Sequence, residues 1–301
     1  RYIDPKNNKA LVDKKKEKYW SPADMYVGGT EHATRHLIYA RFWHKFLYDI
    51  GVVNYKEPFK HLKNQGLIMG ADGRKMSKRW GNVINPDDVV KTYGADTFRL
   101  YESFMGPFEN SVNWSTESMI GSRRFIERVW RLQEKVFGGK KENIKYANAK
   151  LESLVEKTIK KVGEDINHFA HNTAVSALMI LLNELEKETV IKKADYEKLL
   201  LILAPFAPHF TDELWSVLGH KKSINIENWP KYNETKITEA SVTIVVQVNG
   251  KMRATFEAEQ GISDKDLEIK SLAIPEVKKW TDSKEIKKVI VIKNKIVNIV
   301  V

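Results

Sequence analysis

The spacing at which apolar residues recur changes along this chain, and the change limits what it can fold into. Residues 150–219 repeat apolar side chains at helical spacing, with hardly a strand pattern among them. This spacing predicts a bundle of helices. From Val242 to Val248 the period becomes two, and the pair Asn249-Gly250 that follows favours a two-residue hairpin turn. The second half of the chain therefore predicts a helical domain followed by a small α+β domain.

The first third of the chain predicts a strand, a glycine turn and a helix in series. The strand at 25–27 ends at Gly28-Gly29, and the helix runs from residue 30 or 31 to about residue 49. Apolar residues such as Leu37, Phe42 and Phe46 alternate with basic ones along this helix. We therefore expect one of its faces to pack on a sheet.

The helix after residue 85 has the clearest local end signals. Asn85 is suited to the N-cap, Pro86 to the first position, and Gly94 to the stop. The other predicted elements are an irregular lead-in at 1–20, a helix or turn at 59–68 that runs into a strand at 67–69, helices at 95–105 and 116–136, a flexible break at 138–141, a helical stretch at 263–280, and strands at 288–292 and 296–301.

The net charge and the absence of cysteine limit which binding partners and metal sites the chain can have. Lys plus Arg number 50 and Asp plus Glu 39, so the formal charge of +11 favours a polyanion such as nucleic acid, although a lysine-rich genome would give the same excess. The sequence has no cysteine, so it can form no disulfide or thiolate zinc site, and this composition is compatible with a reducing compartment.

Metal-binding and membrane patterns are also missing from the sequence. His32 and His36 have helical spacing but lack the glutamate of a zincin motif, so we expect no structural metal. No apolar run reaches the roughly 18 residues that would span a bilayer. We expect a soluble, cytoplasmic protein. The chain begins with Arg1 in what reads like the middle of a segment, which indicates a piece of something longer.

A glycine-flanked basic loop is the strongest chemical feature. Lys75-Met76-Ser77-Lys78-Arg79 has glycines on both sides and no carboxylate between its lysines. Two lysines three residues apart can converge on one polyanion, and glycines let the backbone approach it. The pattern favours phosphate binding; the alternative is a solvated basic turn.

Several blocks in series resemble a class I leucyl-tRNA synthetase of bacterial type. The resemblance covers essentially the whole chain, and the order and spacing of the blocks match as well. The blocks are 26–33 with 36–42, Lys75-Met76-Ser77-Lys78 with 81–83, 93–97, 171–174, 203–209, 246–251, and 290–292 with 298–300. The chain departs from the family's KMSKS ending at Arg79 and Trp80, which puts the dynamics of the loop and its affinity for ATP in question.

The resemblance implies the C-terminal half of a ligase that activates leucine with ATP and transfers it to tRNA(Leu). It assigns residues 1–115 to the second half of a catalytic Rossmann-type domain with the KMSKS-like loop and a stem-contact region. It assigns 116–238 to a helical anticodon-binding-type domain and 239–301 to a small α+β tRNA-binding domain. The N-terminal HIGH-type half is missing, so we expect no activity from this chain alone and name that half as a partner.

Two readings compete with this one. The isolated chain is catalytically inert and only binds tRNA, or it is a basic nucleic-acid-binding scaffold whose loop blocks are accidental.

The same resemblance assigns roles to single residues. Lys75 and Lys78 meet the charge that develops on the ATP phosphates, and Mg²⁺ is carried mainly by those phosphates. The ATP or adenylate site takes Gly28, Gly29, Glu31, His32, Gln65, Gly66, Leu67, Ile68, Met76 and Ser77. The amino-acid pocket takes Tyr26, His32 and His36. Outside that context, Glu31 would only compensate the helix dipole, and His32 and His36 would be core histidines.

Basic residues in the two later domains are expected to contact tRNA phosphates. In the helical domain they are Arg123, Arg124, Arg128 and Arg131, which equally suit a solvated helix face. In the tail they are Lys251, Arg253, Lys287 and Lys288. Met179, Leu182 and Leu185 are expected in the bundle core.

Overall fold

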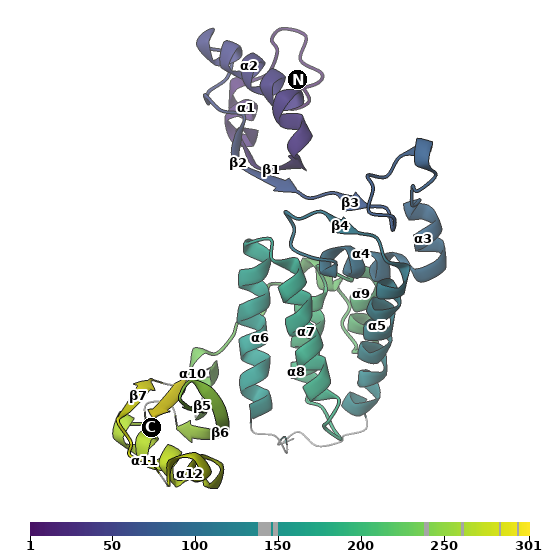
Figure 1. Cartoon of the computed structure of the whole chain (residues 1–301). Coiled ribbons are helices and arrows are strands. Elements are labelled where there is room, and N and C mark those ends of the chain that lie inside the picture. Colours follow the sequence, from purple (N-terminus) through teal and green to yellow (C-terminus); the bar gives the residue numbers. More distant parts are fainter. Residues whose placement is uncertain (138–145, 147–149, 238–240, 260–261, 283, 294) are drawn as a thin grey trace. The chain divides into compact units, whose positions relative to one another are not determined.

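The computed structural model describes residues 1–137, 146, 150–237, 241–259, 262–282, 284–293 and 295–301 (Figure 1). It contains two compact units. The first comprises Arg1–Ile144 and Thr158–Pro230, and the second comprises Lys145–Lys157 and Lys231–Val301. The division of the chain by role at 115 and 238 stays a prediction, and the predicted break at 138–141 lies outside the described residues.

The lead-in is not irregular throughout, because helix α1 (Lys14–Trp20) forms there. Asp13 caps it by accepting hydrogen bonds from the backbone of Lys15 and Lys16. Before it, Asp4 accepts from the ammonium of Lys16 at 2.6 Å and from the Asn7 amide, and these bonds lower the pKa of Asp4 to about 2. The prediction missed this seven-residue helix because its apolar face is short, although its N-cap residue is adjacent in the sequence.

Two parallel strands follow, β1 (Ala23–Gly29) and β2 (Phe59–Gln65). The prediction of a helix or turn over 59–65 was therefore wrong, since pairing with β1 determines the conformation of this segment. The predicted single helix after Gly29 is divided into a 3₁₀ helix η1 (Thr30–Thr34) and helix α2 (His36–Asp49). Arg35 separates the two, with φ −130° and ψ −101°.

Helix α2 does not bury the apolar face that was expected to pack on a sheet. In this helix only Leu37 is buried, whereas six large hydrophobic side chains remain exposed, Trp43 by 58% among them. Helical spacing places Ile38, Tyr39, Phe42 and Phe46 on the same face as Trp43, and Tyr48 on the opposite one. The described residues therefore leave this face open, and such patches mark interaction sites.

The next segment joins a short sheet to three helices. Strand β3 (Ile68–Met69) pairs in parallel with β4 (Val112–Asn113), and between them lie the 3₁₀ helix η2 (Lys78–Trp80), α3 (Pro86–Tyr93) and α4 (Ala95–Phe104). Asn85 caps α3 as predicted, and Gly94, at φ +88°, ends it. Their shared core consists of Val89, Tyr101, Trp114 and Met119.

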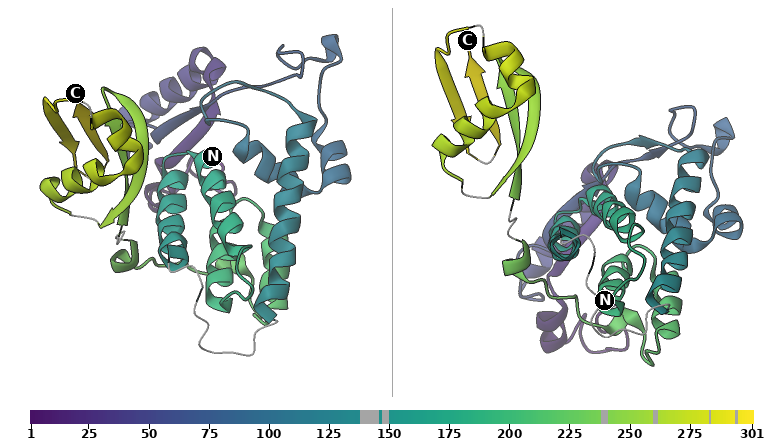
Figure 2. Two further views of the ribbon diagram at one scale, coloured as in Figure 1. Left: turned by 60° about the horizontal axis from the view of Figure 1, so that its bottom comes forward. Right: turned by 90° about the horizontal axis from the view of Figure 1, so that it is seen from below.

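The predicted helical bundle is confirmed. It comprises α5 (Thr116–Phe137), α6 (Lys150–Asn167), α7 (His171–Leu185), α8 (Lys193–Leu203) and α9 (Pro208–Val217), followed by the 3₁₀ turn η3 (Ile224–Ile226) (Figures 1 and 2). Leu182 and Leu185 are fully buried, and Met179 is half-buried. Tyr196 donates to the Val129 carbonyl at 3.0 Å inside the bundle, where burial raises the pKa of its hydroxyl.

The second unit is a four-stranded mixed sheet with helices. Short helix α10 (Glu234–Ile237) precedes β5 (Ser241–Val248), β6 (Lys251–Glu259), α11 (Asp264–Ala273), α12 (Pro275–Thr281), β7 (Lys288–Ile292) and β8 (Ile296–Val300). The strand order is β6-β5-β8-β7, with β5 and β8 parallel. Asn249 and Gly250 form the predicted turn, both at positive φ (47° and 76°), and Figure 2 shows α11 and α12 beside the sheet.

Candidate functional site

The glycine end of β1 meets the end of β2. Gly28 pairs with Asn64 and Gly29 with Gln65, and η1 begins at the next residue. A Cβ on Gly29 would overlap the Glu31 carboxylate, which is folded back over this glycine. Glycine is therefore required at this turn as long as Glu31 keeps that position.

The residues predicted for the amino-acid pocket form one aromatic cluster. The ring of Tyr26 lies 5.6 Å from that of His36, and His36 lies edge-on to His32 at 6.2 Å. The Tyr26 ring also packs against Phe59 of β2, with ring centres 4.5 Å apart. Both histidines are exposed, so the cluster is open to solvent in the described chain and is not the packed core of the alternative reading.

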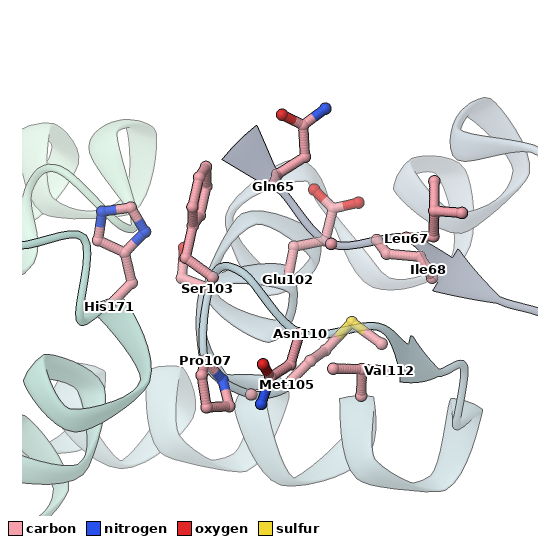
Figure 3. Close-up of a pocket in the computed structure, with 13 residues that line it drawn as sticks. Gln65, Leu67, Ile68, Glu102, Ser103, Met105, Pro107, Asn110, Val112 and His171 are labelled. Atoms are coloured by element: carbon pink, nitrogen blue, oxygen red, sulfur yellow. The ribbon is translucent and has the colours of Figure 1, made fainter. Parts of the chain in front are cut away.

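Segment 65–68 forms one wall of a pocket of about 210 Å³ (Figure 3). The other walls come from α4, from the loop that leads to β4, and from His171 at the start of α7. Gly66 donates its N–H to the Phe108 carbonyl at 2.8 Å, and a Cβ at Gly66 would overlap the backbone of Asn110. The glycine thus allows two chain segments to approach closely.

Two ionisable side chains of this pocket have shifted pKa values. Burial raises the pKa of Glu102, against the opposing charge of Arg99, and burial lowers the pKa of His171. Both side chains are therefore biased toward their neutral forms. The Oε1 atom of Gln65 is buried and has no hydrogen-bond partner among the described residues.

The basic loop is a compact turn. Gly70 and Arg74 are joined by a 2.8 Å backbone hydrogen bond, and Lys75 pairs with Met69 in an antiparallel bridge. Ser77 caps η2 by accepting from the Arg79 N–H, and its own N–H donates to Asn82 at 2.9 Å. The loop therefore keeps its shape through its own hydrogen bonds.

Within that turn, some side chains are partly buried and others are exposed. Met76 packs against the core of Val89 and Trp114, whereas Lys75 and Lys78 are exposed and make no ion pair with any described residue. Two guanidinium groups lie over the Trp80 ring, that of Arg74 at 5.2 Å and that of Arg79 at 5.0 Å from its centre. The arginine that departs from the family pattern thus has a stacking role inside the loop.

Strand pairing limits how far apart the glycine turn and the basic loop can lie. Gly29 pairs with Gln65, four positions before Met69, which pairs with Lys75. Strand spacing and extended chain length place the Cα atoms of Gly29 and Lys75 at most about 25 Å apart. Among the described residues no hydrogen bond or ion pair joins the two segments, so a shared ATP site stays a prediction.

The arginines of α5 differ in their contacts. Arg123 pairs with Glu127 at 2.8 Å and donates to the Tyr93 carbonyl. Arg128 is half-buried and forms an ion pair with Glu186, the C-cap residue of α7, and this ion pair lowers the pKa of that carboxyl. Arg124 and Arg131 are exposed, and neither forms an ion pair with the described part of the chain.

In the second unit, Arg253 is the most constrained of the predicted RNA-contacting residues. It is the extra residue at a bulge, since Val246 pairs with Ala254 and Gln247 with Met252. Its guanidinium lies 3.6 Å from the Trp280 ring centre, and its Nε is buried without a partner among the described atoms. The remaining three lysines, Lys251, Lys287 and Lys288, are exposed.

Comparison with known proteins assigns the chain to a class. A family model described as "tRNA synthetases class I (I, L, M and V)" matches residues 6–115, and one described as "Anticodon-binding domain of tRNA ligase" matches residues 148–269. The chain belongs to the class I tRNA synthetases. Within the class it is similar to the leucyl-tRNA synthetase of Agrobacterium radiobacter K84, solved in a ternary complex with tRNA and LeuAMS, at 33% identity and a TM-score of 0.79.

That alignment covers 96% of this chain but 39% of the solved one, so the chain spans well under half of its relative. Methionyl-tRNA synthetase of Mycobacterium tuberculosis, bound by methionyl-adenylate, is 19% identical with a TM-score of 0.54, covering 71% of this chain and 47% of that one; this likeness shows the fold alone. The predicted resemblance to a bacterial-type leucyl-tRNA synthetase and the predicted fold class are confirmed.

Sequence reasoning missed the polar contact that joins α4 to α9. Asp96 is buried and accepts from His209 Nδ1 at 2.8 Å and from the Phe210 N–H at 2.5 Å. Asp96 and His209 lie in two of the blocks that carry the family resemblance and Phe210 directly follows one of them, but no local sequence signal pairs α4 with α9. In the described residues there is no helix apolar and long enough to cross a membrane, and no group of three or more metal-ligating side chains.

Proposed function

We propose that this chain is part of a leucyl-tRNA synthetase, which activates leucine with ATP and transfers it to tRNA(Leu). The loop carries the proposal: Met76 anchors it to a core while Lys75 and Lys78 stay exposed and without ion pairs among the described residues. Likeness to a leucyl enzyme over 96% of the chain supports the choice of amino acid.

In the proposed reaction, Lys75 and Lys78 bind the β and γ phosphates as the bond to pyrophosphate breaks. A lysine about 4 Å from a phosphate charge gains about 1 kcal/mol in bulk water but about 4 kcal/mol at an effective dielectric of 20. The lysines therefore contribute chiefly when the loop closes and excludes water. Met76 and Ser77 hold the turn that presents them.

The remaining site residues supply shape and hydrogen bonds. Gly28 and Gly29 let backbone approach the nucleotide, and Glu31 accepts from ribose hydroxyls. His32, His36 and Tyr26 would line the leucine side of the site, and the clustering of their rings supports this assignment. Segment 65–68 meets the adenine through its backbone. Mg²⁺ accompanies ATP and neutralises phosphate charge.

The chain needs a partner to complete this site. We propose that the N-terminal half of the synthetase, in the same polypeptide or as a separate chain, covers the exposed face of α2 that includes Phe42 and Trp43. Burial of apolar surface gives about 25 cal/mol per Å², so covering these five side chains would favour association. Without this half, the chain is the inert tRNA-binding module of the alternative reading.

Leucine-dependent exchange of pyrophosphate into ATP tests the proposal. The chain alone should show none, and adding the N-terminal half of a bacterial leucyl-tRNA synthetase should restore it. Lys78→Ala should depress the restored exchange by at least about tenfold, while tRNA binding changes little. Exchange with another amino acid but not with leucine would refute the substrate, and equal losses of exchange and tRNA binding in Lys78→Ala would refute the role of the loop.

A further inference from the structure

A groove of about 530 Å³ lies between α5 and the first turn of α9. Its apolar part consists of Ile126, Trp130 and Phe210, and its charged part consists of Arg123, Glu127 and Arg131. Ile126 is buried and Phe210 half-buried, whereas Trp130 is 41% exposed. The groove thus presents one open indole on a covered apolar floor, at a volume within the usual range for ligand sites of about 300–1,000 Å³.

Contacts with α5 and with α4 hold Phe210, which forms part of the groove. Phe210 packs against Trp130, with ring centres 5.9 Å apart and planes at 47°. The backbone N–H of Phe210 donates to the buried Asp96 carboxylate, which also accepts from His209. The ring beneath Trp130 is therefore tied to α4, and little conformational freedom is left to lose when a ligand stacks on the indole.

The charges at the rim favour an anion beside that ring. Arg131 is exposed and makes no ion pair with the described residues, although its charge helps to lower the pKa of Glu186. Arg123 shares its guanidinium between Glu127 and the Tyr93 carbonyl. Two arginines against one glutamate leave a net positive rim around an aromatic surface.

We propose that this groove holds an unpaired nucleotide of bound RNA, with its base stacked on Trp130 and its phosphate bound by Arg131. Every base has a π-face, so an exposed indole beside a free guanidinium suits single-stranded nucleic acid. The chain's charge of +11 favours the same partner. The inference rests on the proposed function, because tRNA is the RNA that this protein would meet.

Binding and fluorescence of one set of variants test the groove. Trp130→Ala should weaken binding of a tRNA(Leu) transcript by about 5- to 150-fold, the range measured for loss of one stacked base. Trp130→Phe keeps a smaller ring and should lose less, and Arg131→Ala should also weaken binding. Trp20→Ala removes another exposed indole, 65% accessible on α1, and should bind as the unaltered chain does.

Stacking also has an optical readout. A short single-stranded oligoadenylate should quench tryptophan emission in the unaltered chain and in Trp20→Ala, and the quench should be largely lost in Trp130→Phe. A fully paired RNA duplex of equal length should quench less. Thermal unfolding of each variant checks that the bundle is intact.

The possible failures are distinguishable. If the unaltered chain binds tRNA and Trp130→Ala binds it equally well, the groove is not a nucleotide site, while the proposed synthetase function stands. If the chain fails to bind tRNA at all, the function and the groove assignment both fall. A quench by an apolar peptide but not by oligoadenylate would make the groove a protein-docking site and overturn the inference.

Discussion

At the scale of single residues, His171 links the pocket of Figure 3 to the pH dependence of stability. It lies among the rings of Phe108, Phe169 and Phe206, and burial lowers its pKa below the usual 6.5. As the pH falls through 6.5, the unfolded chain binds a proton here before the folded protein does, so the free energy of unfolding decreases. Above that pH the residue is neutral in both states and contributes no pH dependence.

His171→Phe should therefore reduce the loss of thermal stability between about pH 7.5 and about pH 5.5. The phenyl ring keeps the aromatic packing and removes the titrating group. His61→Gln, which removes an exposed histidine, is the control substitution. If the Phe variant loses as much stability on acidification as the unaltered chain, burial of His171 does not govern this behaviour.

Gly66 provides a second test at this scale. Ala at this position would place a Cβ against the Asn110 backbone and break the 2.8 Å bond from its N–H to Phe108. We expect a loss of about 2–4 kcal/mol in the free energy of unfolding measured with urea. Gly121→Ala, where the helix surface is open, should instead gain about 0.5–1 kcal/mol. Similar effects at the two positions would contradict the close approach seen at Gly66.

At the scale of helices and strands, the sequence predicted what is encoded locally. Asn85 and Gly94 bound α3 as expected, and Asn249-Gly250 turns the hairpin. The prediction for segment 59–65 was wrong because its strand exists only through pairing with β1. The prediction of one helix after Gly29 was wrong because Arg35 breaks a helix whose apolar pattern continues across it. The glycine turn, the loop lysines and the aromatic cluster were predicted from blocks of sequence, and their functional roles stay predictions. The Asp96–His209 and Arg128–Glu186 pairs join distant residues and carry no local signal.

Asp96 shows what such a long-range contact contributes to the joining of α4 and α9. Asp96→Ala leaves the Phe210 N–H without its acceptor and should lower the free energy of unfolding by about 2–3 kcal/mol. Asp96→Asn keeps one acceptor oxygen and should lose less. His209→Gln, at a side chain 77% exposed, should lose less than about 1 kcal/mol. Urea denaturation measures these free energies. An equal loss of stability in all three variants would mean that Asp96 stabilises the fold through its pair with His209 and not through the N–H of Phe210 at the start of α9.

At the scale of the whole molecule, the two units present basic residues of different kinds. In the first, Arg124 and Arg131 project from a helix, and in the second, Arg253 is fixed by a bulge and by Trp280. A residue that is already ordered loses little entropy on binding, whereas exposed lysines such as Lys288 act mainly through charge. We therefore expect affinity for tRNA to depend on the sum of charges and its orientation to depend on the few stacked arginines.

The salt dependence of tRNA binding separates these contributions. For the intact chain, log Kd against log salt should be linear, with a slope of about 0.7–0.9 for each phosphate neutralised. Lys288→Ala should lower that slope by the amount that corresponds to about one phosphate contact. Arg253→Lys keeps the charge and so the slope, but it should weaken binding at every salt concentration because the ammonium cannot reproduce the planar stack on Trp280. A flat response of the unaltered chain would exclude a phosphate-dominated interface, and an unchanged Kd in Arg253→Lys would show that the stack on Trp280 does not orient RNA.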